Sequence, residues 1–133
     1  RVSLLLNQHN KSIKGSKILV LGVAYKKDIK DVRESPALDV LKLLANRGGE
    51  VFYNDPFVPI LKLDDLDEKS VKLTTKLLRG CDCTVIVTDH SSYDYRWIVA
   101  NSWILICRPP SPLMQITCLP GLASAAPMLA GSE

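Results

Sequence analysis

One uninterrupted apolar run constrains the fold of this 133-residue chain more than any other feature. It reads KILVLGVAY from Lys17 to Tyr25, after the turn-forming pair Gly15-Ser16 and before a run of charged residues. A strand that is apolar on both faces needs cover on both faces, and a parallel strand flanked by helices has that cover. The run therefore predicts a central, buried strand of an α/β sheet.

Helical and strand patterns alternate along the rest of the chain. Ser35 and Pro36 predict the start of a helix, which leucines at helical spacing continue as far as Gly48-Gly49. Strands are predicted over 50–54, 84–88 and 103–107, and helices over 75–79, capped by Thr74, and over 93–101; residues 61–69 show no clear pattern. This alternation predicts a single α/β domain with a three-layer, Rossmann-like, mostly parallel sheet.

The distribution of charge places the chemistry of the chain before residue 109. Lys and Arg number 17 and Asp and Glu number 14, and the net charge of +3 is too small to indicate a nucleic-acid or membrane surface. Residues 109–133 hold five of the eight prolines and carry a charge only at Glu133. We expect them to form an atypical, poorly ordered tail, and a frame-shifted or foreign origin would explain its composition.

Several further features bound the class of protein. The chain has no run of about 18 apolar residues, so we expect no membrane-spanning helix and a soluble, cytoplasmic protein. It begins with Arg1 rather than Met, which favours a fragment of a longer polypeptide, and processing is the alternative explanation. The four cysteines lack the spacing of a zinc site, so they are expected to be reduced thiols and no metal site is predicted. They are Cys81, Cys83, Cys107 and Cys118.

The loop after the first predicted strand is rich in charged side chains that could contact a ligand. A dinucleotide-binding turn needs the pattern G-x-G-x-x-G, which lets backbone amides approach a pyrophosphate, and only Gly22 is present here. We therefore predict that this sheet does not bind NAD in that way. The mixed charges of the loop suit internal ion pairs and contacts to a phosphorylated ligand, and a solvated charged loop is the alternative. They are Lys26, Lys27, Asp28, Lys30, Asp31 and Arg33.

Four motifs, in the same order along the chain, resemble the C-terminal, UDP-binding domain of the UDP-glucose/GDP-mannose dehydrogenase family, and most closely its UDP-N-acetyl-sugar branch. The motifs are GVAYKKD over 22–28, DVRESPAL over 31–38, YNDP over 53–56 and VIVTDH over 85–90. The resemblance covers about residues 1–108.

The resemblance implies an NAD-dependent enzyme that oxidises the C6 alcohol of a UDP-sugar to the uronate. In that family NAD binds to an N-terminal domain and the catalytic cysteine lies upstream of the segment seen here. We therefore expect residues 1–14 to be the end of the helix that connects the domains and residues 15–108 to be the UDP-binding domain, inactive alone. The expected partners are the UDP-sugar, the N-terminal and central domains of the same enzyme, and further copies in a homo-oligomer.

The resemblance assigns substrate contacts to Tyr25, Lys26 and Arg108. An ammonium at Lys26 would stabilise negative charge near the phosphates or the reacting sugar. Arg108 matches the arginine of the Asp-x-Arg sequence that ends the last strand in the family, although Ile106 replaces the acid. No catalytic residue and no metal ligand is predicted.

Other polar residues are interpreted as structural. Asp28, Asp31 and Arg33 match charged positions of the family's loop, and we assign them to its organisation. His90 follows a predicted strand, and we interpret it as a hydrogen-bonded structural group. The sequence forces no carboxylate partner near it. Asp55 is interpreted as part of a turn with the proline that follows it.

Two other classes of function remain open from the sequence. One is a stand-alone nucleotide-binding or regulatory module. A receiver-like switch would use Asp55 at a strand end, but Tyr25 and Lys26 occupy the places of the acidic pair that holds Mg²⁺. The other is a mainly structural module that mediates dimerisation.

Overall fold

The computed structural model describes residues 2–63, 66–107 and 115–117. Its helices and strands follow one another along the chain as α1 (Val2–Gln8), β1 (Lys17–Leu21), α2 (Pro36–Asn46), β2 (Glu50–Asn54), β3 (Ile60–Leu63), β4 (Leu66–Lys69), α3 (Thr75–Gly80), β5 (Cys83–Ile86), α4 (Tyr95–Asn101), β6 (Ile104–Cys107) and β7 (Gln115–Thr117). Among the residues so described, no helix has the length and apolar character needed to cross a membrane.

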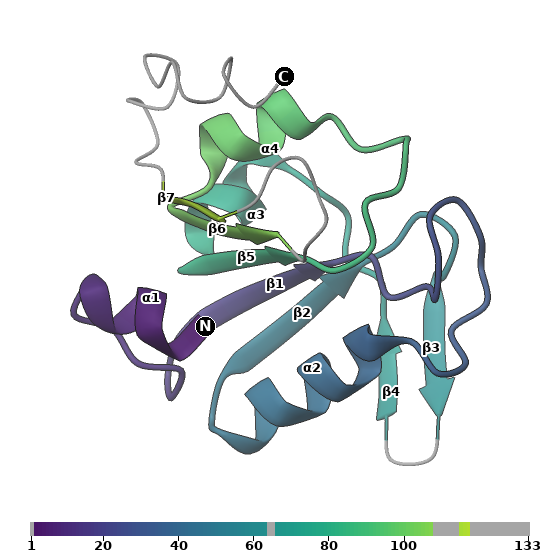
Figure 1. Ribbon diagram of the computed structural model, residues 1–133, viewed down its shortest axis with the longest axis horizontal. Helices are drawn as coiled ribbons and strands as arrows, with labels where there is room; N and C mark the ends of the chain where they lie inside the picture. Colours follow the sequence, from purple (N-terminus) through teal and green to yellow (C-terminus); the bar gives the residue numbers. More distant parts are fainter. Residues whose placement is uncertain (1, 64–65, 108–114, 118–133) are drawn as a thin grey trace.

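The larger sheet is built around β1, and its strands lie in the order β2-β1-β5-β6-β7 (Figure 1). β1 pairs in parallel with β2 on one side and with β5 on the other, and β6 continues the sheet in parallel beyond β5. The chain thus moves outward from β1 to β2 and then returns to the opposite side of β1. In open α/β sheets, ligands bind beyond the carboxyl ends of the strands at such a reversal.

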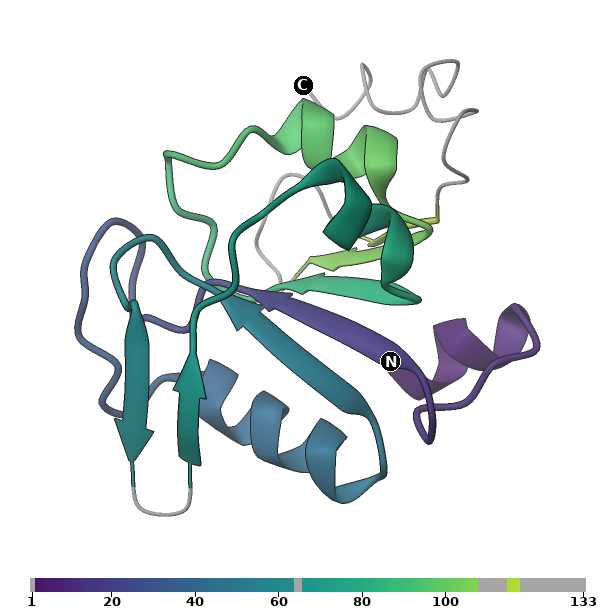
Figure 2. The same cartoon turned by 180° about the vertical axis from the view of Figure 1, so that it is seen from behind.

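Two cores lie on opposite faces of the sheet. Ile18 and Val20 of β1 belong to the core beneath α2, whereas the intervening Leu19 and Leu21 belong to the core beneath α3 and α4, and all of these side chains are fully buried. Figures 1 and 2 show α2 on one face and α3 with α4 on the other. This arrangement confirms the predicted three-layer, Rossmann-like α/β fold.

Side chains cap the helices where the sequence predicts helix starts. The Ser35 side chain accepts a hydrogen bond from the backbone N–H of Ala37, and Thr74 caps α3 in the same manner. The last helix begins at Tyr95 rather than at residue 93, because Asp94 is its cap and accepts from the N–H of Trp97.

The hairpin β3–β4 was not predicted. Among the described strands, these two pair with each other alone, antiparallel, and form a small separate sheet. Their partner register joins Leu61 to Glu68 and Lys62 to Asp67, so pairing in space, rather than a regular apolar alternation, defines them.

Strand β7 lies in the segment expected to be an atypical tail. It pairs antiparallel with β6, and Leu105 is the partner of Ile116 in the register. The remaining residues of that segment, 109–114 and 118–133, lie outside the described residues. The assignment of residues 1–14 to a connecting helix and of 15–108 to the UDP-binding domain stays a prediction.

Two of the four cysteines lie in the described core. Cys81 and Cys83 are unpaired and buried, and burial raises the pKa of these thiols to about 11 and about 12. Burial therefore disfavours the thiolate, the reactive form, of both side chains near neutral pH.

Gly22, directly after β1, permits a close approach that no other residue type allows. Its φ is +82°, and an added Cβ would lie 2.1 Å from the carbonyl oxygen of Thr88. Gly15 has the same φ, but a Cβ there would meet nothing within 4 Å.

We expect Gly22→Ala to lower the free energy of unfolding by about 3 kcal/mol or more, because the positive-φ cost adds to a backbone collision. Gly15→Ala should lower it by only about 1 kcal/mol, the conformational cost alone. Urea denaturation of both variants measures the difference, and equal losses would contradict the predicted contact with Thr88.

Candidate functional site

The loop of residues 22–35 joins β1 to α2 and lies at the carboxyl edge of the sheet (Figure 1). It is closed at its base by a hydrogen bond of 2.6 Å from the backbone N–H of Tyr25 to the carbonyl of Asp31. The carbonyl of Ala24 accepts from the hydroxyls of Thr88 (2.6 Å) and Ser35 (3.3 Å). The start of the loop is therefore held from both α2 and the segment after β5.

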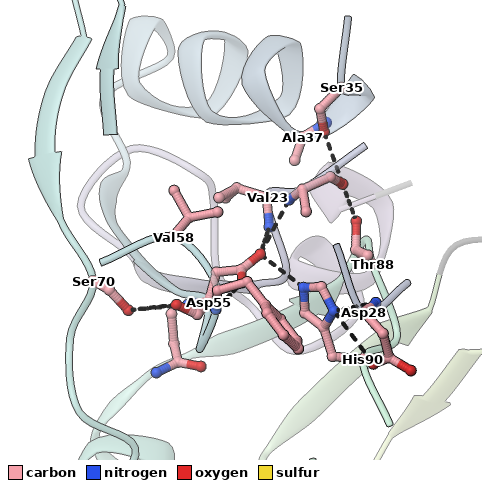
Figure 3. Close-up of polar contacts among 12 residues, drawn as sticks. Val23, Asp28, Ser35, Ala37, Asp55, Val58, Ser70, Thr88 and His90 are labelled. Atoms are coloured by element: carbon pink, nitrogen blue, oxygen red, sulfur yellow. Dashed lines mark hydrogen bonds and ion pairs between the residues drawn. The ribbon is translucent and has the colours of Figure 1, made fainter. Parts of the chain in front are cut away.

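A buried carboxylate, that of Asp55, lies beneath this loop just after β2. One oxygen, Oδ2, accepts from the backbone N–H groups of Val23 (2.8 Å) and Ala24 (3.0 Å) and lies 2.8 Å from Nε2 of His90 (Figure 3). The other oxygen accepts from the N–H of Phe57 at 2.8 Å. Asp55 is 1% exposed, so these donors replace the water that an isolated carboxylate would need.

His90 links this carboxylate to the outer part of the loop. Its ring is fully buried, and Nδ1 accepts a hydrogen bond of 2.8 Å from the backbone N–H of Asp28. A nitrogen that accepts from an N–H carries no proton, so Nε2 carries the proton and donates to Asp55. The imidazole is thus neutral, with each nitrogen serving a different segment.

The structural interpretation of His90 agrees with this geometry, but the sequence analysis missed its carboxylate partner, Asp55, which was interpreted only as a turn residue. The available signal was positional. Both residues follow strands that we predicted, and parallel strands bring their carboxyl ends to one edge of a sheet.

The tip of the loop is fixed a second time through the side chain of Asp28. Its carboxylate accepts from the backbone N–H (2.8 Å) and the hydroxyl (2.7 Å) of Ser91, and these bonds lower the pKa of Asp28. Asp28 has a φ of +61°, a left-handed conformation that Asp adopts more readily than most residues.

Asp31 and Arg33 form an exposed bidentate pair. Nε and an Nη of Arg33 donate to the two carboxylate oxygens at 3.1 and 3.0 Å, and these hydrogen bonds lower the pKa of Asp31 to about 2. Exposed pairs of this kind contribute little to stability. The loop-organising role assigned to Asp28, Asp31 and Arg33 stays a prediction that is consistent with these contacts.

Tyr25 and Lys26, two of the predicted substrate contacts, project from this held loop. Both side chains are exposed, and Nζ of Lys26 lies 5.7 Å from the centroid of the Tyr25 ring, within the range of a cation–π contact. Arg108, the third predicted contact, lies outside the described residues, so its role also stays a prediction. Within the part of the chain that the structure describes, no group of three or more His, Cys, Asp or Glu residues could hold a metal ion.

Residues 19–109 match the model of the UDP-glucose/GDP-mannose dehydrogenase family, UDP binding domain. The chain belongs to this family. The match confirms the resemblance found in the sequence and includes every motif on which it rests.

Individual members of the family show the same relationship. A UDP-N-acetyl-D-mannosamine dehydrogenase of Methanococcus maripaludis is 33% identical over 90 residues, which are 67% of this chain and 20% of that protein. The solved structure of a UDP-D-ManNAc dehydrogenase from Pyrococcus horikoshii superposes with a TM-score of 0.62 at 30% identity, covering 80% of this chain and 25% of that one. A UDP-glucose dehydrogenase from Pyrobaculum islandicum gives a TM-score of 0.61 at 27% identity, covering 79% and 24%.

The similarity covers only part of the length of these relatives. The chain spans about one fifth of the length of the curated relatives it matches. Those relatives are dehydrogenases, and the part that this chain shares with them is the UDP-binding domain.

We expect Asp55→Asn to lower the free energy of unfolding by about 2–4 kcal/mol. An amide supplies one acceptor oxygen where the carboxylate supplies two, so buried N–H groups would lose a partner or face an NH₂ group. Asp39→Asn is the matched control, because Asp39 is exposed in the first turn of α2 and should change stability by about 0.5 kcal/mol. Urea denaturation measures both, and a loss at Asp55 no larger than at Asp39 would refute the role given to its carboxylate.

Proposed function

We propose that this chain is the UDP-sugar-binding C-terminal domain of an NAD-dependent nucleotide-sugar 6-dehydrogenase, an enzyme that oxidises the C6 alcohol of a UDP-sugar to the uronate. One observation carries the proposal. Motifs that are far apart in the sequence meet at the carboxyl edge of β1, β2 and β5, where Asp55 and His90 hold the loop that presents Tyr25 and Lys26.

Lys26 is the leading ligand contact in this proposal. Its ammonium would donate charge-assisted hydrogen bonds to the diphosphate or stabilise negative charge on the reacting sugar. Such contacts strengthen once water is excluded, so the other domains of the enzyme would increase the contribution of Lys26 by closing over the ligand. The ring of Tyr25 offers an adjacent surface for packing, and Arg108 is proposed as a second cation.

The described residues after β1 do not fit NAD. In a dinucleotide-binding turn the backbone N–H groups after the first strand face a pyrophosphate. Here the N–H groups of Val23 and Ala24 donate to the buried carboxylate of Asp55. In the proposed enzyme NAD accepts the hydride, and its binding is assigned to the N-terminal domain, as is the catalytic cysteine to a segment outside this chain.

The common ligand portion is proposed to be UDP, because relatives similar to this chain carry the names of dehydrogenases for different UDP-sugars. The homo-oligomer expected from the resemblance and the cytoplasmic location expected from the sequence belong to the same proposal.

Calorimetric titration of the chain tests the proposal. We expect saturable binding of UDP and no saturable binding of NAD at equal concentrations, because the amides after β1 are already occupied. Absence of UDP binding, or equal affinity for the two nucleotides, would refute the proposed function.

The contribution of Lys26 can be separated from the general charge of the loop. We expect Lys26→Ala to weaken UDP binding about 10-fold or more, since a hydrogen bond from a charged group contributes about 1.5–3 kcal/mol. Lys30→Ala removes the same charge from the same exposed loop and should change affinity less than about twofold. Equal losses in the titration would show that only the net charge matters.

A further inference from the structure

We propose that His90 is a positioning residue, which holds Tyr25 and Lys26 in their ligand-binding arrangement only while its Nδ1 is unprotonated. This inference rests on the proposed function, because it concerns how the same loop meets a UDP-sugar. It gives the family's loop a pH-dependent support that lies inside the domain rather than at the ligand.

The argument begins with how short the unsupported part of the loop is. Ala24 is fixed through its N–H to Asp55 and through its carbonyl to Thr88 and Ser35. The next fixed backbone N–H after Tyr25 is that of Asp28, which donates to Nδ1 of His90. Only Lys26 and Lys27 lie between the hydrogen-bonded backbone N–H groups of Tyr25 and Asp28, so the bond to Nδ1 restricts where Lys26 can extend.

The two ring nitrogens of His90 have separable tasks. Nε2 faces Asp55 in the core, and Nδ1 faces the backbone of the loop (Figure 3). A neutral imidazole has one acceptor nitrogen and a protonated one has none. Protonation would therefore keep the bond from Nε2 to Asp55 and strengthen it by charge. At the other nitrogen, the N–H of Asp28 would face another N–H, and the loop would have to move.

The surroundings of the ring come from several segments. The titratable groups that face it are the carboxylates of Asp55 and Asp28, the latter with Oδ1 3.8 Å from Nδ1, and the phenol ring of Tyr93, whose centroid lies 5.9 Å away. The hydroxyl of Tyr95 donates to the backbone carbonyl of His90 at 2.6 Å. Both carboxylates would attract a protonated imidazole.

Two substitutions each retain the hydrogen bond of one ring nitrogen of His90 and lose that of the other. The amide oxygen of Asn branches at Cγ, as Nδ1 does, so His90→Asn keeps an acceptor for the N–H of Asp28 but does not reach Asp55. The amide of Gln extends one carbon further, so His90→Gln keeps a donor for Asp55 but offers the loop nothing. A purely structural role would favour Gln, because the buried charge of Asp55 keeps its partner.

The test uses three proteins, namely wild type, H90N and H90Q. For each protein we would measure UDP affinity by calorimetry, amide hydrogen exchange at Asp28 and urea unfolding. The measurements run between about pH 5.5 and 8, which spans the usual titration range of histidine. We expect wild-type affinity to fall about threefold or more towards pH 5.5, together with protection of the Asp28 amide. H90N should bind UDP at pH 8 within about threefold of wild type and should lose the part of the pH dependence that comes from His90. Any pH dependence that remains in H90N then measures the titration of UDP itself. H90Q should bind about tenfold more weakly although it is no less stable than H90N.

A wild-type affinity whose pH dependence is unchanged in H90N would overturn the inference, as would an H90Q variant that binds as wild type does. Affinities that merely follow the order of stability would also overturn it. If wild type does not bind UDP at pH 8, the proposed function fails instead, and the exchange rate of the Asp28 amide still decides the role of His90: equal protection in H90N and H90Q overturns it, and selective loss in H90Q supports it.

Discussion

The buried carboxylate of Asp55 is the interaction on which the arrangement of this edge depends. It occupies the backbone N–H groups after β1 that face a pyrophosphate in a dinucleotide-binding sheet. A buried charge is costly unless its hydrogen bonds are complete, so Asp55 requires Val23, Ala24 and His90 to be in place together. The Asp55 carboxylate thus takes the place that the pyrophosphate of a bound dinucleotide has in such a sheet, and it joins the ends of β1, β2 and β5.

Order passes from this core to the surface through a continuous set of contacts. Asp55 holds His90, and His90 holds the backbone of Asp28 (Figure 3). The Asp28 side chain in turn accepts hydrogen bonds from Ser91. Lys26 is exposed, but the backbone on both sides of it is fixed. In its proposed ligand-binding role, Lys26 would lose less conformational entropy on binding than a cation on a free loop, because its loop is restrained.

Much of the fold could be predicted, because the decisive signals are local. The apolar run of β1, the β-branched residues of β5 and the caps Ser35 and Thr74 each act within a few residues. The hairpin β3–β4 and strand β7 were not predicted, because antiparallel pairing with the neighbouring strand, rather than a clear sequence pattern, defines them. In the site, Tyr25 and Lys26 were predicted through the family motifs, whereas the partnership of Asp55 with His90 was not predicted.

The sequence by itself determined the layered fold and the family. The apolar run of β1 requires burial on both faces, and each of the four ordered motifs consists of residues that are neighbours in the chain. Only the tertiary structure decided that Asp55 and His90, which are 35 positions apart, form a buried pair that reaches Asp28. The physical reason is topological: β2 and β5 lie on either side of β1, and no local preference of the chain specifies which strand ends meet there.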